Sequence, residues 1–244
     1  ESMEREASSD ERSEIASLLG QAVDAGAFGF STTNLAQHIG YKGRPLACRK
    51  ADVEELRAYC RVLQERGRGS IELALTKDVS VVDESEFELL DLLLSESQRP
   101  VTWLALLNRD DKPEAPQQTL RDTAPLLERG AIPQVTVRPL LVQIDLRNPF
   151  LFANIDCFNP AFNRTVEEQK EVYRSTSLRD GFRKELENPR IFSGKWDRAV
   201  INQVGNPELQ ELVGRTVEDV ARERGRDGMD TFLDLAIEDN LELQ

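Results

Sequence analysis

The sequence predicts an α/β protein: a partial TIM-type (β/α) barrel of about four to five parallel strands, followed by a helical, loop-rich C-terminal part. Three observations predict it. Apolar runs typical of buried strands begin near residues 28, 71, 101 and 134, in steps of 43, 30 and 33 residues. An amphipathic helical segment precedes each run, and this alternation stops after Asp145. Steps of this length are typical of βα units, whose strands pair in parallel.

The first unit begins with a helix. Ser8 is followed by acidic residues in the first turn, Ile15, Leu18 and Leu19 then recur on one face, and Gly26 ends the run. Residues 27–32 are predicted to form a short buried strand that ends in hydroxyl side chains. The polar stretch over residues 33–50 is long for an ordinary connection between two elements.

Three further helix and strand pairs follow. Each helix is indicated by apolar residues at one-face spacing, and each strand by a short, mostly apolar run. The predicted helices contain Leu56, Tyr59, Cys60 and Leu63, then Phe87, Leu90 and Leu94, then Leu120, Ala124 and Leu127. The predicted strands that follow them cover residues 70–75, 101–106 and 134–141.

The C-terminal part has another character. Aromatic segments interrupted by Asn and Pro lead into short amphipathic helices, and only residues 199–203 could form a fifth strand. We therefore divide the chain into a βα-repeat portion, residues 1–146, and an aromatic and helical region, residues 147–244. A closed barrel needs eight strands, so this is about half of one, and a self-contained open sheet is the alternative. Helices are predicted over residues 166–175, 178–186, 207–213, 217–224 and 229–238.

Composition excludes several classes of function. The chain of 244 residues carries 31 Lys and Arg against 44 Asp and Glu, a formal charge of −13. The basic residues are scattered, which argues against nucleic acid and against an anionic membrane surface as partners. No apolar run is long enough to span a bilayer, and the first residues do not resemble a signal peptide. Three cysteines without metal-ligand spacing indicate reduced thiols, so we expect a cytoplasmic protein.

His38 is the single histidine in the sequence. Zinc sites for hydrolysis commonly use two or three histidines, and a Ser–His–Asp triad needs one of its own. A histidine-rich active site would therefore have to be completed from outside this chain. His38 follows the predicted strand end at Ser31 and Thr32, which in a barrel is the catalytic face. It is the candidate catalytic residue, and the alternative is a loop histidine bonded to backbone.

Five further residues are candidates for substrate binding. Ser31 and Thr32 could orient a carboxylate or an amide, although turn formation explains them equally well. Arg44 could clamp a carboxylate through two hydrogen bonds, or form a surface salt bridge. Glu72 and Arg138 stand inside otherwise apolar predicted strands. A charge pointing into a barrel must be paired, and such positions are often functional, whereas the opposite alternation would make each a contact at an edge or with a helix.

Several segments resemble one known family. They include the run from Asp24 to Thr33, His38, Gly43-Arg44-Pro45, Gly67-Arg68-Gly69-Ser70, Arg99-Pro100-Val101-Thr102, the aromatic stretches around Phe150 and Phe158, and Gly214-Arg215-Thr216-Val217. In this order they are similar to the central barrel region of the N-acyl-D-amino-acid deacylases, which belong to the metal-dependent amidohydrolase superfamily. The run containing Gly29-Phe30-Ser31-Thr32, with His38 downstream, is the most specific part of the resemblance.

The resemblance implies a hydrolase that cleaves the linear amide bond of N-acyl-D-amino acids at one or two zinc ions. None of the family's metal ligands matches a residue here, because the two mid-barrel histidine positions fall in Leu73-Ala74-Leu75 and Trp103-Leu104-Ala105. We therefore expect an incomplete middle part of such an enzyme, which binds no zinc alone. Its partners would be a small N-acyl amino acid and either a second copy or the missing parts of the barrel. The alternative is a non-catalytic binding or assembly domain derived from the family.

Overall fold

A computed structural model of the chain describes residues 2–35, 38–40, 44–108, 112–153, 155–187, 189 and 192–244. The described residues form two compact units. Unit 1 runs up to Pro139 and unit 2 begins at Leu140. Within the described ranges, no helix combines the length and the apolar character needed to cross a membrane.

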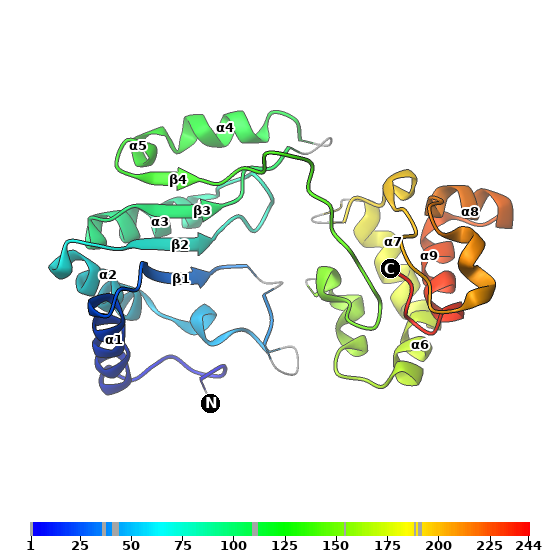
Figure 1. The fold of residues 1–244 in the computed structure, drawn as a ribbon, viewed down its shortest axis with the longest axis horizontal. Helices are drawn as coiled ribbons and strands as arrows, with labels where there is room; N and C mark the ends of the chain where they lie inside the picture. The colour runs from blue at the N-terminus through cyan, green and yellow to red at the C-terminus, as the bar shows by residue number, and fades with distance from the viewer. Residues whose placement is uncertain are drawn as a thin grey trace. The chain divides into compact units, whose positions relative to one another are not determined.

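Unit 1 is built on a parallel sheet of four strands, β1 (Gly29–Thr33), β2 (Ser70–Ala74), β3 (Val101–Leu104) and β4 (Ala131–Pro133). The strands lie side by side in the order of the sequence (Figure 1), as they do in a barrel. The predicted α/β class with a partial TIM-type barrel is therefore confirmed. The helices between the strands are α1 (Ser9–Asp24), α2 (Val53–Arg66), α3 (Glu84–Ser97), α4 (Ala115–Asp122) and α5 (Ala124–Leu127).

Local signals in the sequence explain where these helices begin and end. The Ser8 side chain accepts a hydrogen bond from the Glu11 N–H, and the Glu11 carboxylate in turn accepts one from the Ser8 N–H. Asp83 and Glu86 form the same reciprocal cap at α3. Helix α2 ends at Gly67, whose left-handed φ of 61° favours glycine.

The two faces of the sheet differ. Ile71, Leu73, Val101 and Trp103 are almost completely buried against leucines of α2 and α3 and form the core of unit 1. Because side chains alternate along a strand, the residues between them point to the opposite face. We call that side the polar face, because it carries Ser31, Thr33, Glu72 and Thr102.

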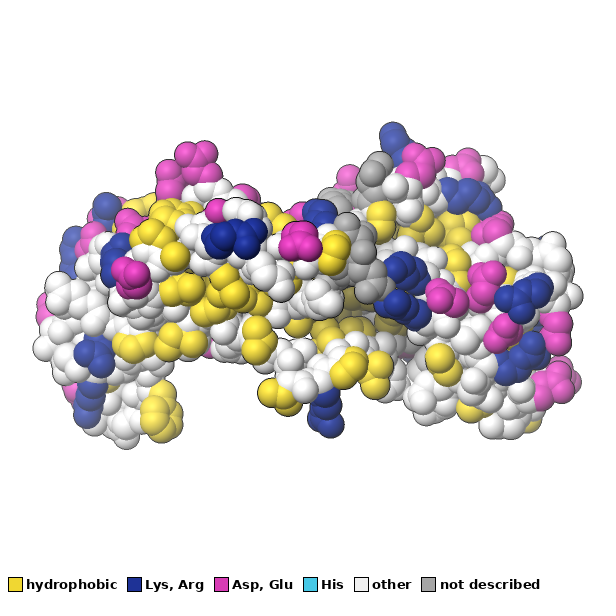
Figure 2. All heavy atoms as spheres, turned by 90° about the horizontal axis from the view of Figure 1, so that it is seen from above, with side chains coloured by type: hydrophobic (Ala, Val, Ile, Leu, Met, Phe, Trp, Pro, Cys, Tyr) yellow, Lys and Arg dark blue, Asp and Glu magenta, His cyan; other side chains and the backbone are white. Residues whose placement is uncertain are grey.

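The predicted strand over residues 134–141 is wrong. The fourth strand is β4, which ends at Pro133, because its register is set by pairing of Val101 with Ala131. Beyond Gln134 the apolar side chains are exposed, Val135 by 63% and Val137 completely. Apolar side chains gather on the side of unit 1 that faces the viewer in Figure 2. The possible fifth strand over residues 199–203 is also wrong, since Val200 makes only an isolated bridge to Thr216.

Unit 2 is helical, as predicted. Its α-helices are α6 (Val166–Arg174), α7 (Thr176–Glu187), α8 (Val217–Arg224) and α9 (Gly228–Glu238). Residues 207–212, predicted as an α-helix, form a 3₁₀ helix that starts at Pro207. Short 3₁₀ turns also occur at Phe150–Phe152, Asp156–Ala161 and Trp196–Arg198, and in unit 1 at Ala47–Lys50. Phe152, Phe158 and Phe182 are completely buried in the core of this unit.

The three cysteines are unpaired. Cys60 is buried against α3, and burial raises the pKa of its thiol to about 12. Burial likewise raises the pKa of the half-buried Cys157 to about 11. Both thiols are therefore protonated at neutral pH and poor nucleophiles.

Candidate functional site

Three polar side chains form a row across the polar face. Ser31 of β1 pairs in register with Glu72 of β2, which pairs with Thr102 of β3. Side chains that face each other across neighbouring strands lie about 5 Å apart. The fourth member of the row is Ile132, whose side chain is 49% exposed, and Ser31 is exposed as well. The polar part of the row therefore runs from β1 to β3 and ends at the apolar Ile132 of β4, and solvent can reach both ends of the row.

Glu72 is the central residue of this row. The Thr102 hydroxyl donates a hydrogen bond to Glu72 Oε2, and Gln134 Nε2 donates another to the same oxygen at 2.7 Å. Among the described residues, Glu72 Oε1 has no hydrogen-bond partner and no cation pairs with the carboxylate. Because side chains alternate along β2, Glu72 lies on the polar face. This face lines the interior when such a sheet closes into a barrel.

His38 lies beyond the carboxyl end of β1. Its Nδ1 is 2.7 Å from the hydroxyl oxygen of Thr33, which also accepts a hydrogen bond from the Leu35 N–H. Thr33 is two residues after Ser31 and therefore on the same sheet face. Burial, and secondarily the positive charge of Arg49, lowers the pKa of His38. The imidazole is therefore neutral at pH 7 and can accept a proton.

The two candidate arginines are placed differently. Arg44 forms a salt bridge of 2.7 Å with Glu4, and both side chains are about half exposed. This contact corresponds to the surface salt bridge expected as the alternative for Arg44, whose neighbour Gly43 lies outside the described residues. Arg138 is exposed in the irregular segment after β4. Its expected position inside a strand is wrong, because the ladder between β3 and β4 ends before it.

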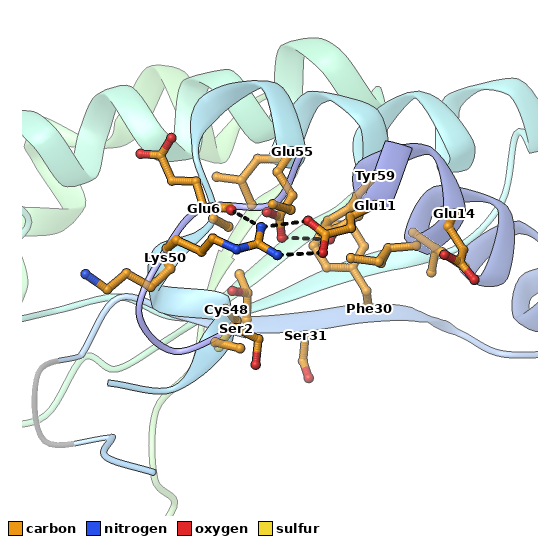
Figure 3. A pocket seen from close by; sticks show the side chains of 18 residues that line it. Ser2, Glu6, Glu11, Glu14, Phe30, Ser31, Cys48, Lys50, Glu55 and Tyr59 are labelled. Carbon is orange, nitrogen blue, oxygen red and sulfur yellow. Dashed lines mark hydrogen bonds and ion pairs between the residues drawn. The ribbon is translucent and has the colours of Figure 1, made fainter. Parts of the chain in front are cut away.

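Unit 1 also contains a pocket of about 590 Å³ beside β1. Ser31 and Thr32 lie on its wall, although Ser31 points to the other side of the strand from Phe30 (Figure 3). Arg5 lines the pocket and donates two hydrogen bonds of 2.8 Å to the carboxylate of Glu11, which also lines it. These bonds lower the pKa of Glu11 to about 2. The other lining residues are Ser2, Glu6, Ala7, Glu14, Ile15, Leu19, Ala47, Cys48, Lys50, Ala51, Glu55, Leu56 and Tyr59.

The described residues do not fit a metal centre. In the part of the sequence that the structure describes, no group of three or more His, Cys, Asp or Glu side chains could hold an ion. In the two segments where the resembling family carries its mid-barrel histidines, the residues on the polar face are Ala74 and Leu104, which pair in register and have no side-chain atom that could bind a metal.

The aromatic segments of unit 2 contribute side chains to its core and to its surface. Phe152 and Phe158 stack with their ring centres 4.5 Å apart and are completely buried. Phe150 is instead 46% exposed. These residues are part of the core and the surface of unit 2.

Three residues of the site were not predicted. Thr33, Thr102 and Gln134 hold His38 and Glu72 in place. Thr102 could have been found, because it occupies the polar position of its strand and the strand pattern already indicated parallel pairing. Gln134 could not, because residues 134–141 were assigned to the strand itself.

Neither a protein-family model nor a curated protein matches this sequence. Among solved structures, it is similar to a D-aminoacylase described as defining a novel subset of amidohydrolases, with a TM-score of 0.44 and 18% identity. A D-aminoacylase mutant in complex with copper chloride matches with a TM-score of 0.44 and 20% identity. A D-aminoacylase studied for its binuclear metal centre matches with a TM-score of 0.41 and 20% identity. Each match covers 96% of this chain and 38% of the other. The chain thus spans well under half the length of these structures.

Proposed function

We propose that this chain supplies part of the substrate-binding wall of an amidohydrolase-type barrel that hydrolyses a linear amide C–N bond, most simply that of an N-acyl-D-amino acid. The observation that carries the proposal is the polar row Ser31, Glu72 and Thr102 on the sheet face opposite the helices, with His38 beyond the end of β1. In (β/α) barrels, substrates bind at the carboxyl ends of the strands. The chain would be the middle part of the enzyme.

The residues of this chain would bind and orient the substrate. Glu72 can accept a hydrogen bond from an amide N–H through Oε1, and Ser31 lies beside it to contact the acyl group or the carboxylate. His38, held by Thr33 and neutral at pH 7, would accept a proton during attack on the amide carbonyl. Zinc, where the resembling family uses it, would activate water, and its ligands would have to come from residues outside the described ones.

A non-catalytic binding or assembly domain is the second candidate. The observation that favours it is the apolar character of Ala74 and Leu104 on the polar face, in the strand segments where a metal-dependent hydrolase of the resembling family would need ligands. Such a domain could keep the polar row for binding without hydrolysis.

The test is an assay of the complete gene product. We expect the purified protein to contain zinc and to hydrolyse N-acetyl-D-amino acids faster than their L enantiomers. His38→Gln should lower kcat/KM by about 100-fold or more, the usual contribution of a proton-transferring side chain. Glu72→Gln should also lower kcat/KM, because it removes the charge that accepts the substrate N–H, whereas the matched control Glu88→Gln, at an exposed position of α3, should have no effect. An intact protein without bound metal and without amidase activity would favour the binding domain.

We also propose that the two outer strands of the sheet are covered in the functional protein. β1 and β4 each pair on one side only in the described sheet, and unpaired strand edges promote association. A second copy or the remaining strands of a barrel would cover them. Light scattering should show a dimer for the isolated chain, and a monodisperse monomer would contradict this.

The three unpaired cysteines support a cytoplasmic location.

A further inference from the structure

We propose that Glu72 forms a binding subsite that selects a hydrogen-bond donor and rejects an anion, and that Thr102 and Gln134 are the positioning residues that set this preference. The subsite would take the N–H of an amide or an ammonium group. Only the identification of that N–H with the scissile amide of an N-acyl amino acid rests on the proposed function. The inference itself rests on the contacts of the Glu72 carboxylate.

The two carboxylate oxygens of Glu72 have different surroundings. Oε2 accepts hydrogen bonds from both the Thr102 hydroxyl and Gln134 Nε2, whereas Oε1 has no partner among the described residues. An ionised carboxylate can accept about four hydrogen bonds. Two donors on one oxygen therefore fix the orientation of the group while leaving Oε1 able to accept from a ligand.

The positioning residues come from two different places in the sheet, one within β3 and one directly after β4. Thr102 is the register partner of Glu72 on β3. Gln134 follows β4 directly and spans β3 to reach Glu72, 62 residues away in the sequence. A carboxylate held by neighbours on two strands loses less rotational freedom when a ligand binds than a free glutamate would.

The charge of the subsite determines what it can bind. Glu72 forms no ion pair with any described residue, and its neighbours in the row, Ser31 and Thr102, are uncharged. A ligand carboxylate placed at Oε1 would meet like charge without a compensating donor. An N–H would instead form a charge-assisted hydrogen bond, which is stronger than a bond between neutral groups.

The same contacts could serve only to join β2, β3 and β4. The two explanations differ in one measurable quantity, the ratio of affinities for a ligand with an N–H and an isosteric ligand without it. A structural role changes the free energy of unfolding but leaves this ratio unchanged. A positioning role changes the ratio even in variants that keep the fold.

The experiment is calorimetric titration of the metal-depleted complete protein with three probes. They are N-acetyl-D-leucine, its ester analogue in which oxygen replaces the amide N–H, and propylammonium. We expect the amide to bind at least about tenfold more tightly than the ester, because a hydrogen bond to a charged group contributes about 1.5–3 kcal/mol. Glu72→Leu should abolish this preference. Gln134→Ala and Thr102→Val should each reduce it about threefold or more.

Gln118→Ala is the matched control. Gln118 lies on α4 and bonds only within its own helix, to Asp122 and Arg121, so this variant should keep the full preference. Circular dichroism establishes that each variant is folded. Folded Gln134→Ala and Thr102→Val variants with an unchanged amide-to-ester ratio would overturn the inference.

The probes also separate this inference from the proposed function. If propylammonium binds in a manner that depends on Glu72 and Gln134 while N-acetyl-D-leucine does not bind, the subsite stands and the proposed substrate is wrong. If no donor binds, or if binding is the same in Glu72→Leu, the subsite is wrong.

Discussion

In unit 1 the sheet buries aliphatic side chains on its helix side and presents hydroxyl, carboxylate and amide groups on the other. In unit 2 the aromatic side chains of several short elements pack on one another, and the charged groups that flank them are paired. Arg179, for example, lies 2.6 Å from both Asp230 and Asp234. Unit 1 therefore keeps a hydrogen-bond acceptor, Glu72 Oε1, for a ligand. In unit 2 the carboxylates of Asp230 and Asp234 are paired with arginine and stabilise the fold.

The largest expected effect is in the aromatic core of unit 2. Phe182 is completely buried and packs edge to face on Phe158, with ring centres 5.0 Å apart. Phe182→Ala should lower the free energy of unfolding of unit 2 by about 3–5 kcal/mol, because it removes this packing and leaves a cavity. Phe150→Ala, at a half-exposed phenylalanine of the same unit, is the control and should cost far less.

The two tryptophans allow this to be measured unit by unit. Trp103 lies in the core of unit 1, and Trp196 is partly buried against the core of unit 2. Urea unfolding followed by fluorescence in a Trp103→Phe background reports unit 2, and in a Trp196→Phe background it reports unit 1. If Phe182→Ala lowered both midpoints equally, the two units would unfold together and the contrast between them would fail.

The next largest loss of stability is expected at Gly29, the first residue of β1. Gly29 has a φ of +137°, and a Cβ there would lie 1.8 Å from the Ser70 carbonyl oxygen. Gly29→Ala should therefore destabilise unit 1 by at least about 2 kcal/mol, since both the backbone and the β1–β2 contact must shift. Gly26→Ala is the control, because Gly26 also has a positive φ but open space around it. Equal losses for the two variants in Trp103 fluorescence would show that only backbone strain matters.

A smaller effect is expected from the paired charges of unit 2. Arg179 is only 17% exposed, and its removal leaves the partly buried Asp230 and Asp234 with one more exposed arginine partner each, Arg183 and Arg226. Arg179→Ala should cost about 2 kcal/mol in the unfolding of unit 2. Arg222→Ala should cost less than about 0.5 kcal/mol, because Arg222 is 71% exposed and pairs only with Asp219. A similar loss in both variants would mean that the Arg179 contacts are no better than a surface ion pair.

Much of unit 1 could be predicted because its signals are local. The cap at Ser8 and the periodic leucines place α1 within two residues of its observed bounds. The position of β4 could not be predicted, since residues 134–141 alternate like a strand while the actual strand is selected by pairing with β3. Sequence pattern also identified Glu72 as an unusual charge in a strand. Its partners Thr102 and Gln134 are distant from it in the sequence, and only the pairing of β2, β3 and β4 in register brings them together.

The smallest expected effect is a dependence on pH at His38. Its pKa is lowered in the folded protein, chiefly by burial, so the unfolded chain binds the proton more readily. The folded state should therefore lose stability as pH falls through the ordinary range of histidine, and this loss should be absent above it. Urea unfolding of unit 1 at pH 7.5 and pH 5.5 should show a larger acid loss in the natural chain than in His38→Gln. Because His38 is the single histidine, an identical loss in both would assign the acid sensitivity to carboxylates. His38 would then be a solvated loop residue, and the proton-accepting role proposed for it on unit 1 would lose its support.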